Sequence, residues 1–112
     1  MPAAYSDQFL EQGSDFTSQI NLDDDNGTPL DLSYFTVVSQ AKKSYYSNTA
    51  TLVFDASVYD AANGIIKLVA SAAQTANLAP GKLVYDVVIT EISTGLKTRI
   101  LEGQVFVSPG VS

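Results

Sequence analysis

Apolar and polar side chains alternate with a period of two along most of the chain, which is the pattern of strands with one face in a core. The predicted strands cover residues 15–22, 34–43, 51–58, 66–70, 83–89 and 101–107, with a weaker one at 7–12. The side chains expected to face the core are Phe16, Ser18, Ile20, Leu22, Phe35, Val37, Ser39, Ala41, Leu52, Phe54, Ala56, Val58, Ile66, Leu68, Ala70, Leu83, Tyr85, Val87, Ile89, Leu101, Gly103, Val105 and Val107.

Turn residues separate these strands, and one stretch departs from the β pattern. Asn26-Gly27 and Asn63-Gly64 are turn dipeptides, because glycine adopts positive φ at little steric cost. Ser71 and Gln74 have the spacing of a capping box, so a helix of at most two turns is expected before Pro80. Six strong strands and one weak strand, with turns between them, predict an all-β sandwich. We expect one domain over residues 1–112, with short loose tails at both ends.

Composition removes several classes of function. The 112 residues include no cysteine and no histidine, which excludes disulfides, thiolate zinc sites and serine–histidine–aspartate catalysis. The formal charge of −6 opposes contact with nucleic acid or anionic membranes. The first residues lack the basic and apolar regions of a signal peptide, so synthesis in the cytoplasm is expected.

Acidic residues are the first candidates for chemistry. Asp23-Asp24-Asp25 resembles a calcium loop, but aligning Gly27 with the glycine of an EF-hand puts Leu22 and Ser33 at the end ligand positions. The remaining acids lie in polar strand phases or turns, as expected for solvated side chains. They are Asp55, Asp60, Asp86, Glu91 and Glu102. We therefore expect no enzyme activity, no metal and no cofactor.

A loop at residues 42–49 is the candidate docking site. It holds Lys42, Lys43, Tyr45 and Tyr46, and exposed tyrosines bury much area at low entropic cost when they contact a partner. One alternative is that this loop is only solvated, at the end of the sandwich. A carbohydrate-binding or adhesion module is the other alternative, with Tyr34, Tyr45, Tyr46 and Tyr59 as the available rings.

Several segments occur together in a familiar order. They are residues 9–16 (FLEQGSDF), 27–32 (GTPLDL), 63–68 (NGIIKL), 74–82 (QTANLAPGK) and 85–87 (YDV). This order resembles the small immunoglobulin-like domains of tailed-phage virion proteins, including the N-terminal domain of baseplate upper proteins and small structural proteins of cyanophage-type myophages. The resemblance spans nearly the whole chain, although each motif consists of turn and core residues that other sandwiches share.

The resemblance implies an immunoglobulin-like sandwich of about seven strands that serves as a virion structural protein. Its place would be at the baseplate, neck, tail or capsid. Its expected partners are other virion proteins or copies of itself, in an oligomer or larger assembly with closed symmetry. We also expect the weak strand at residues 7–12 to pair with a neighbouring subunit instead of its own sheet.

Overall fold

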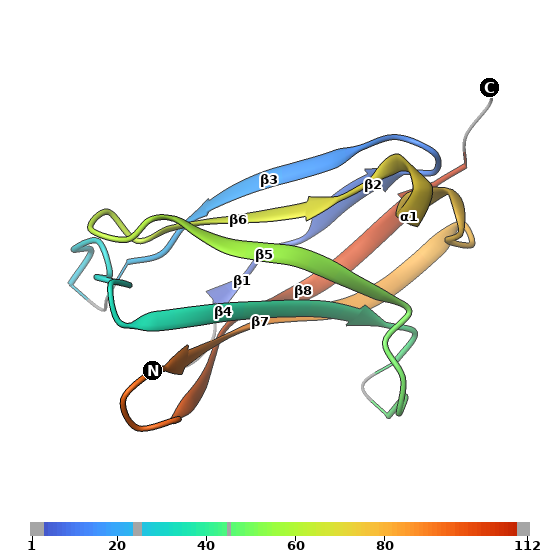
Figure 1. Cartoon of the computed structure of the whole chain (residues 1–112). Coiled ribbons are helices and arrows are strands. Elements are labelled where there is room, and N and C mark those ends of the chain that lie inside the picture. The colour runs from blue at the N-terminus through green and yellow to red at the C-terminus, as the bar shows by residue number, and fades with distance from the viewer. Residues whose placement is uncertain (1–3, 24–25, 45, 110–112) are drawn as a thin grey trace.

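The computed structural model describes residues 4–23, 26–44 and 46–109. These residues form eight strands and one short helix (Figure 1). In chain order the elements are β1 (Ala4–Tyr5), β2 (Gln8–Glu11), β3 (Phe16–Asn21), β4 (Phe35–Lys42), β5 (Leu52–Asp60), β6 (Ile65–Ala70), α1 (Ala72–Ala76), β7 (Gly81–Glu91) and β8 (Lys97–Ser108). The prediction of an all-β, immunoglobulin-like sandwich with one short helix is confirmed.

The strands form two layers that share one strand. β7 lies between β4 and β8 in the first layer, sheet A, and β1 and β2 add to the far side of β8 as parallel strands. β6 lies between β5 and β3 in the second layer, sheet B. β5 pairs with β4 through residues 52–54 and then with β6 through residues 55–60. This change of partner connects the two layers in Figure 1.

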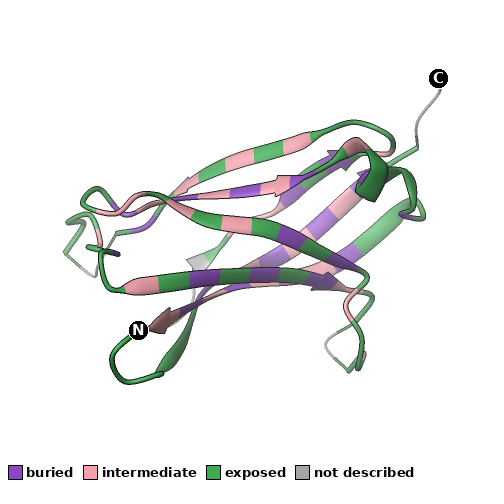
Figure 2. Cartoon of the chain, viewed as in Figure 1, coloured by how far each residue is buried: buried purple, intermediate pink, exposed green. Residues whose placement is uncertain are grey.

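The core lies between the layers, where the alternation predicts it. Figure 2 shows buried and exposed residues alternating along β4 and β5. Phe54 is 3% exposed and contacts two rings: that of Phe16 in β3 at a centroid distance of 5.7 Å, and that of Tyr85 in β7 at 6.3 Å. Val87 and Val105 are fully buried beside them. Phe16 itself is half-buried, because β3 is at the edge of its sheet.

The helix holds the turn between β2 and β3, and its capping box is confirmed. The Ser71 hydroxyl accepts from the backbone N–H of Gln74 at 3.2 Å, and the Gln74 side chain accepts from the Ser71 N–H at 2.9 Å. The buried Thr75 hydroxyl donates to the Ser14 carbonyl at 2.8 Å and accepts from the Gly13 N–H at 3.1 Å. These bonds fix where β3 begins.

The turn before β6 requires glycine. Gly64 has φ +66°, and a Cβ there would overlap the carbonyl oxygen of Leu22 and lie 2.7 Å from that of Leu30. The Asn63-Gly64 turn was therefore correctly predicted, and the close approach of the segment before β4 adds a second reason for the glycine. β5 continues to Asp60, two residues beyond the predicted strand.

The expectation that residues 7–12 pair with another subunit is wrong for the edge that faces β8. β2 pairs in parallel with β8 of its own chain, from Gln8 opposite Val105 to Glu11 opposite Ser108. The inward side chain of Leu10 is 1% exposed, so leaving the sheet would return a buried leucine to water. The predicted tails lie mostly outside the described residues, and the structure begins at Ala4 in β1 and ends at Pro109.

Candidate docking surface

The predicted docking residues begin at the end of β4. Lys42 is the last residue of the strand and is half-buried, whereas Lys43 is exposed. The Tyr46 side chain is 95% exposed, and Tyr45 lies outside the described residues. The Ser47 N–H donates to the Ser44 carbonyl at 3.2 Å within the loop that follows the strand.

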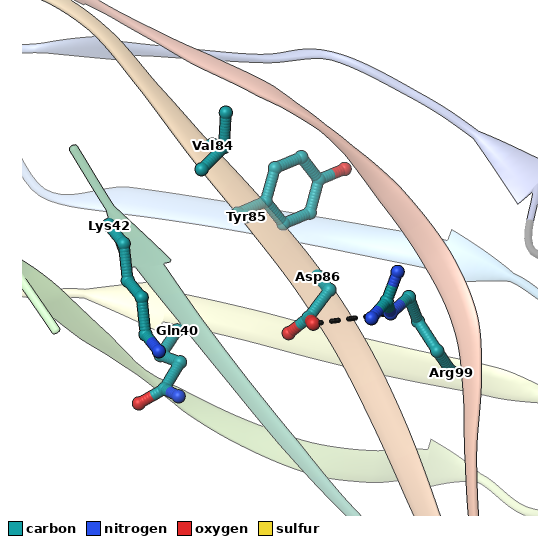
Figure 3. Close-up of a pocket in the computed structure, with 6 residues that line it drawn as sticks. All are labelled: Gln40, Lys42, Val84, Tyr85, Asp86 and Arg99. Atoms are coloured by element: carbon teal, nitrogen blue, oxygen red, sulfur yellow. Dashed lines mark ion pairs between the residues drawn. The ribbon is translucent and has the colours of Figure 1, made fainter. Parts of the chain in front are cut away.

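Lys42 connects this loop to a shallow hollow on the outer face of sheet A. The hollow has a volume of about 160 Å³ and is lined by Gln40, Lys42, Val84, Tyr85, Asp86 and Arg99. Figure 3 shows that these side chains come from three adjacent strands, β4, β7 and β8. The strand register places Gln40 opposite Asp86 and Lys42 opposite Val84, which puts these four residues on one face of the sheet.

An arginine organises the charges beside this hollow. Arg99 Nε lies 3.4 Å from a carboxylate oxygen of Asp86, as Figure 3 shows, and its Nη1 lies 3.2 Å from one of Glu102. The three side chains are one-third to one-half exposed, so each pair contributes about 0–1 kcal/mol to stability. Together the pairs place two carboxylates and one guanidinium side by side on the outer face of the sheet.

Aromatic side chains occupy the other end of the same face. Phe9 on β2 stacks on Phe106 on β8, with ring centroids 5.3 Å apart and an interplanar angle of 16°. Phe9 is nevertheless 73% exposed. Val38 and Val53 on β4 and β5 point outward on this face and are also exposed. These residues were not predicted as docking residues, although apolar side chains in the outward phase of a strand are visible in the sequence.

A buried tyrosine holds the N-terminal strands against β8. The Tyr85 hydroxyl donates to the Ser6 carbonyl at 2.5 Å and accepts from the Gln8 side-chain amide at 3.2 Å. Burial raises the pKa of this hydroxyl above its ordinary value, although the bonds with Gln8 and Ser6 act in the opposite direction. The Asp7 carboxylate accepts from the Gln104 backbone N–H at 3.0 Å. These contacts set the position of Phe9.

Two of the tyrosines that the sequence offers as sugar-binding rings lie at opposite ends of one strand. Tyr34 precedes β4 and Tyr46 follows it. An eight-residue strand spans roughly 27 Å at about 3.4 Å per residue. Tyr59 lies on β5, where the Lys67 ammonium is 5.7 Å from its ring centroid. Tyr34 and Tyr46 therefore lie too far apart to form one sugar-binding platform.

Acidic side chains of the described residues are the candidates for metal binding. No group of three acidic side chains there is arranged to hold a metal ion. Asp24 and Asp25, two members of the predicted acidic run, lie outside the described residues. The described segments also contain no helix with the length and apolar character needed to cross a membrane.

Comparisons with known proteins show similarity of fold. No protein-family model and no curated protein matches the chain. The structure of Listeria monocytogenes InlP aligns with a TM-score of 0.50 and 18% identity, over 92% of this chain and 26% of InlP. The NK cell receptor NKp44, described as a triggering partner in natural cytotoxicity, aligns with a TM-score of 0.54 and 12% identity, over 96% of this chain and 100% of the receptor.

A family 123 glycoside hydrolase from Clostridium perfringens also aligns, with a TM-score of 0.43 and 13% identity, over 96% of this chain and 23% of the enzyme. This likeness is too weak to support an argument about activity. The chain spans about a quarter of InlP and of the hydrolase. The likeness to InlP and NKp44 supports the immunoglobulin-like fold and nothing finer.

Proposed function

We propose that this chain is a structural protein of a phage virion, and that it acts as a docking module through the outer face of sheet A. The observation that carries the docking role is the stack of the exposed Phe9 ring on the half-buried Phe106 ring. Aromatic side chains are enriched in protein interfaces and bury a large area there. Exposed Val38 and Val53 extend the apolar surface of this face.

The fixed charges between these apolar groups give the surface a means of selecting its partner. The Asp86–Arg99–Glu102 group lies on the same outward face as Phe106. Opposed charges across an interface set orientation and reject wrong partners more than they add affinity. Lys42 and Lys43 place positive charge at the end of the face in a chain whose net charge is −6. A partner with carboxylates near these lysines would match this pattern.

The assignment to a phage particle rests on the sequence resemblance described above. In the fold, the motif residues of that resemblance form turns and core: Gly64 makes the turn before β6, and Tyr85 and Val87 fill the core on β7. These positions explain why the motifs favour the fold. They do not point to a contact surface. The exposed apolar side chains on the outer face of sheet A support that face as the one that docks.

The proposal is tested by whether the chain is part of the particle and whether sheet A attaches it. Mass spectrometry of purified particles should detect the chain, and its gene should lie beside capsid, tail or baseplate genes. The double variant Phe9→Ser/Phe106→Ser should reduce incorporation roughly tenfold or more, which corresponds to about 1.4 kcal/mol.

The matched control changes two exposed apolar residues of the β7–β8 turn, Ile92→Ser/Leu96→Ser. This control should enter particles normally, and far-ultraviolet circular dichroism should confirm that both variants fold. Absence of the chain from particles would contradict the virion role. Equal incorporation of both variants would contradict the assignment of the surface.

A further inference from the structure

One strand of sheet B has an open edge. β3 pairs with β6 on one side and is the last strand in the order of the sheet. Figure 1 shows β3 at the outer margin of the sandwich. No strand within residues 4–23, 26–44 or 46–109 pairs with its far side. An edge of this kind presents unpaired amides and carbonyls that a further strand can use.

The hydrogen-bond pattern identifies which backbone groups are open. The Leu22 N–H donates to the Gly64 carbonyl at 2.8 Å, in the same register as the β3–β6 pairs. Hydrogen-bonded and non-bonded pairs alternate in an antiparallel ladder, so the even-numbered residues of β3 are those bonded to β6. The N–H and C=O groups of Thr17, Gln19 and Asn21 therefore point away from β6.

β3 lacks the features that usually block an edge. Its six residues include no charge and no proline, and its six pairs with β6 follow without a register shift. The other margins are different. β5 carries Asp55 and Asp60 and has a register shift between Val58 and Asp60. β2 is only four residues long and ends in Glu11.

The inner side chains of β3 are also incompletely covered. Phe16 and Ile20 pack against the core but remain half-buried, whereas Ile66 and Leu68 of the neighbouring β6 are fully buried. A hollow of about 300 Å³ opens beside Phe16, between β2 and the start of β3. A strand added at this edge would bond the open backbone groups and cover these apolar side chains.

We propose that the strand is β3 of a second copy, paired antiparallel about a two-fold axis at Ser18. In this register Ser18 faces its own copy, and Phe16 of each chain lies opposite Ile20 of the other on the inner face. Thr17 lies opposite Gln19 on the outer face, and the open backbone groups of both residues form a reciprocal bonded pair. Apolar side chains thus meet apolar ones, and no like charges oppose each other within the paired segment.

The charge distribution favours a second copy as the partner at β3 and favours pairing centred on Ser18. Two molecules with a charge of −6 repel each other over most of their surfaces, and β3 is an uncharged strip where they can approach. Centring the pair on Gln19 would also align the open groups, but it would place Asp15 opposite Asp23 of the other chain. Like charges directly opposite destabilise a sheet. The inference rests on the assembly role proposed above and specifies one contact of that assembly.

Two charge variants test the pairing and its register. Thr17→Lys/Gln19→Lys places like charges opposite each other across the axis, whereas Thr17→Glu/Gln19→Lys places opposite charges there. Light scattering should give twice 11.9 kDa for the unmodified chain and for the second variant, and 11.9 kDa for the first. The control Ala62→Lys/Ala76→Lys adds the same charge at exposed sites outside the strands and should leave the mass doubled.

A chain without cysteine permits a second measurement. Ser18→Cys should cross-link rapidly into a covalent dimer on mild oxidation, because Cα atoms of a non-bonded antiparallel pair are about 4.5 Å apart, which suits a disulfide. Gln19→Cys is the matched control and should cross-link much more slowly, since position 19 faces position 17 of the other chain.

A monomeric unmodified chain, or a dimer that Thr17→Lys/Gln19→Lys does not dissociate, would overturn the pairing. A monomeric Thr17→Glu/Gln19→Lys variant or faster cross-linking of Gln19→Cys would overturn the register. Failure of the pairing differs from failure of the virion role, because a monomeric chain that is still found in purified particles removes only the β3 contact.

Discussion

The carbonyl oxygen of Ser6 occupies the space that a Cβ of Gly103 would need. The same oxygen accepts a hydrogen bond from the Tyr85 hydroxyl, whose oxygen is 2.5 Å away. Three strands meet at this oxygen, because Ser6 joins β1 to β2, Gly103 lies in β8 and Tyr85 in β7. The Ser6 N–H also donates to the Glu102 carbonyl at 2.9 Å. The absence of a side chain at Gly103 therefore allows the N-terminal strands to lie against β8.

Gly103→Ala should lower the free energy of unfolding by about 1–3 kcal/mol, the usual cost of adding atoms to a filled site. The atom that the new methyl group meets is backbone, so the segment around Ser6 must move and the bond with Tyr85 must lengthen. Urea denaturation measures the loss, with Ser108→Ala at the exposed end of β8 as the control. An unchanged midpoint for Gly103→Ala would show that this contact is loose.

Phe54→Ala should cost about 3–5 kcal/mol, because it removes a buried ring that contacts Phe16 and Tyr85. Its neighbour on the same strand points outward, so Val53→Ala is a matched control and should change stability by less than about 0.5 kcal/mol. Thermal and urea unfolding of the two variants should differ accordingly. Similar losses of stability for both variants would mean that the inward and outward faces of β5 are wrongly assigned.

The core and the turns could be predicted from sequence because they depend on local pattern. The alternation of Leu52, Phe54, Ala56 and Val58 is visible in the chain itself, and the structure places all four inward. The change of partner of β5 at Asp55 was not predictable, because it depends on which strand lies beside each half. Pairing of β2 with β8 depends likewise on residues almost 100 positions apart.

The candidate surface was only partly accessible to sequence reasoning. Lys42 was identified from its basic and aromatic neighbours, and it lines the hollow on sheet A. Phe9 and Phe106 are far apart in the chain, and only the parallel register of β2 and β8 shows that they stack.

The free energy of unfolding should fall at alkaline pH, because the buried Tyr85 hydroxyl must lose its proton there. Burial raises its pKa above 10.0 in the folded chain, so above about pH 10 the unfolded chain releases this proton more readily than the folded one. The stability that depends on this hydroxyl being protonated is fully present below pH 10. It is lost as the pH rises through the pKa that Tyr85 has in the folded chain. Urea denaturation at several pH values between 8 and 11 should show this decline.

Tyr85→Phe is the test of that assignment. It should lower stability at neutral pH by about 1–3 kcal/mol, because the Ser6 carbonyl and the Gln8 amide lose their partner. It should also flatten the alkaline decline. The exposed Tyr34→Phe variant should keep the unmodified pH dependence. Identical alkaline slopes for the unmodified chain and Tyr85→Phe would refute the role of the buried hydroxyl.

Calcium should have no effect on stability. The acidic run at residues 23–25 has apolar and serine residues at the end positions of a calcium loop, and the chain has no histidine or cysteine. The melting temperature should therefore be the same with millimolar calcium and with a chelator. A bound ion would raise it by mass action, so an increase of several degrees in calcium would establish a site.

The loop after β4 should contribute to docking separately from the open edge of β3. Tyr46 is 95% exposed, and a ring of this size gains much by burial in a contact. Tyr45→Ser/Tyr46→Ser should therefore reduce incorporation into particles while leaving the mass in solution unchanged, because the proposed pairing of copies uses β3. The Tyr59→Ser variant is the control for losing an exposed tyrosine elsewhere on the surface, and it should be incorporated normally. Normal incorporation of the Tyr45→Ser/Tyr46→Ser variant would remove this loop from the docking surface, and a change in its mass would place the contact between copies at the loop instead of at β3.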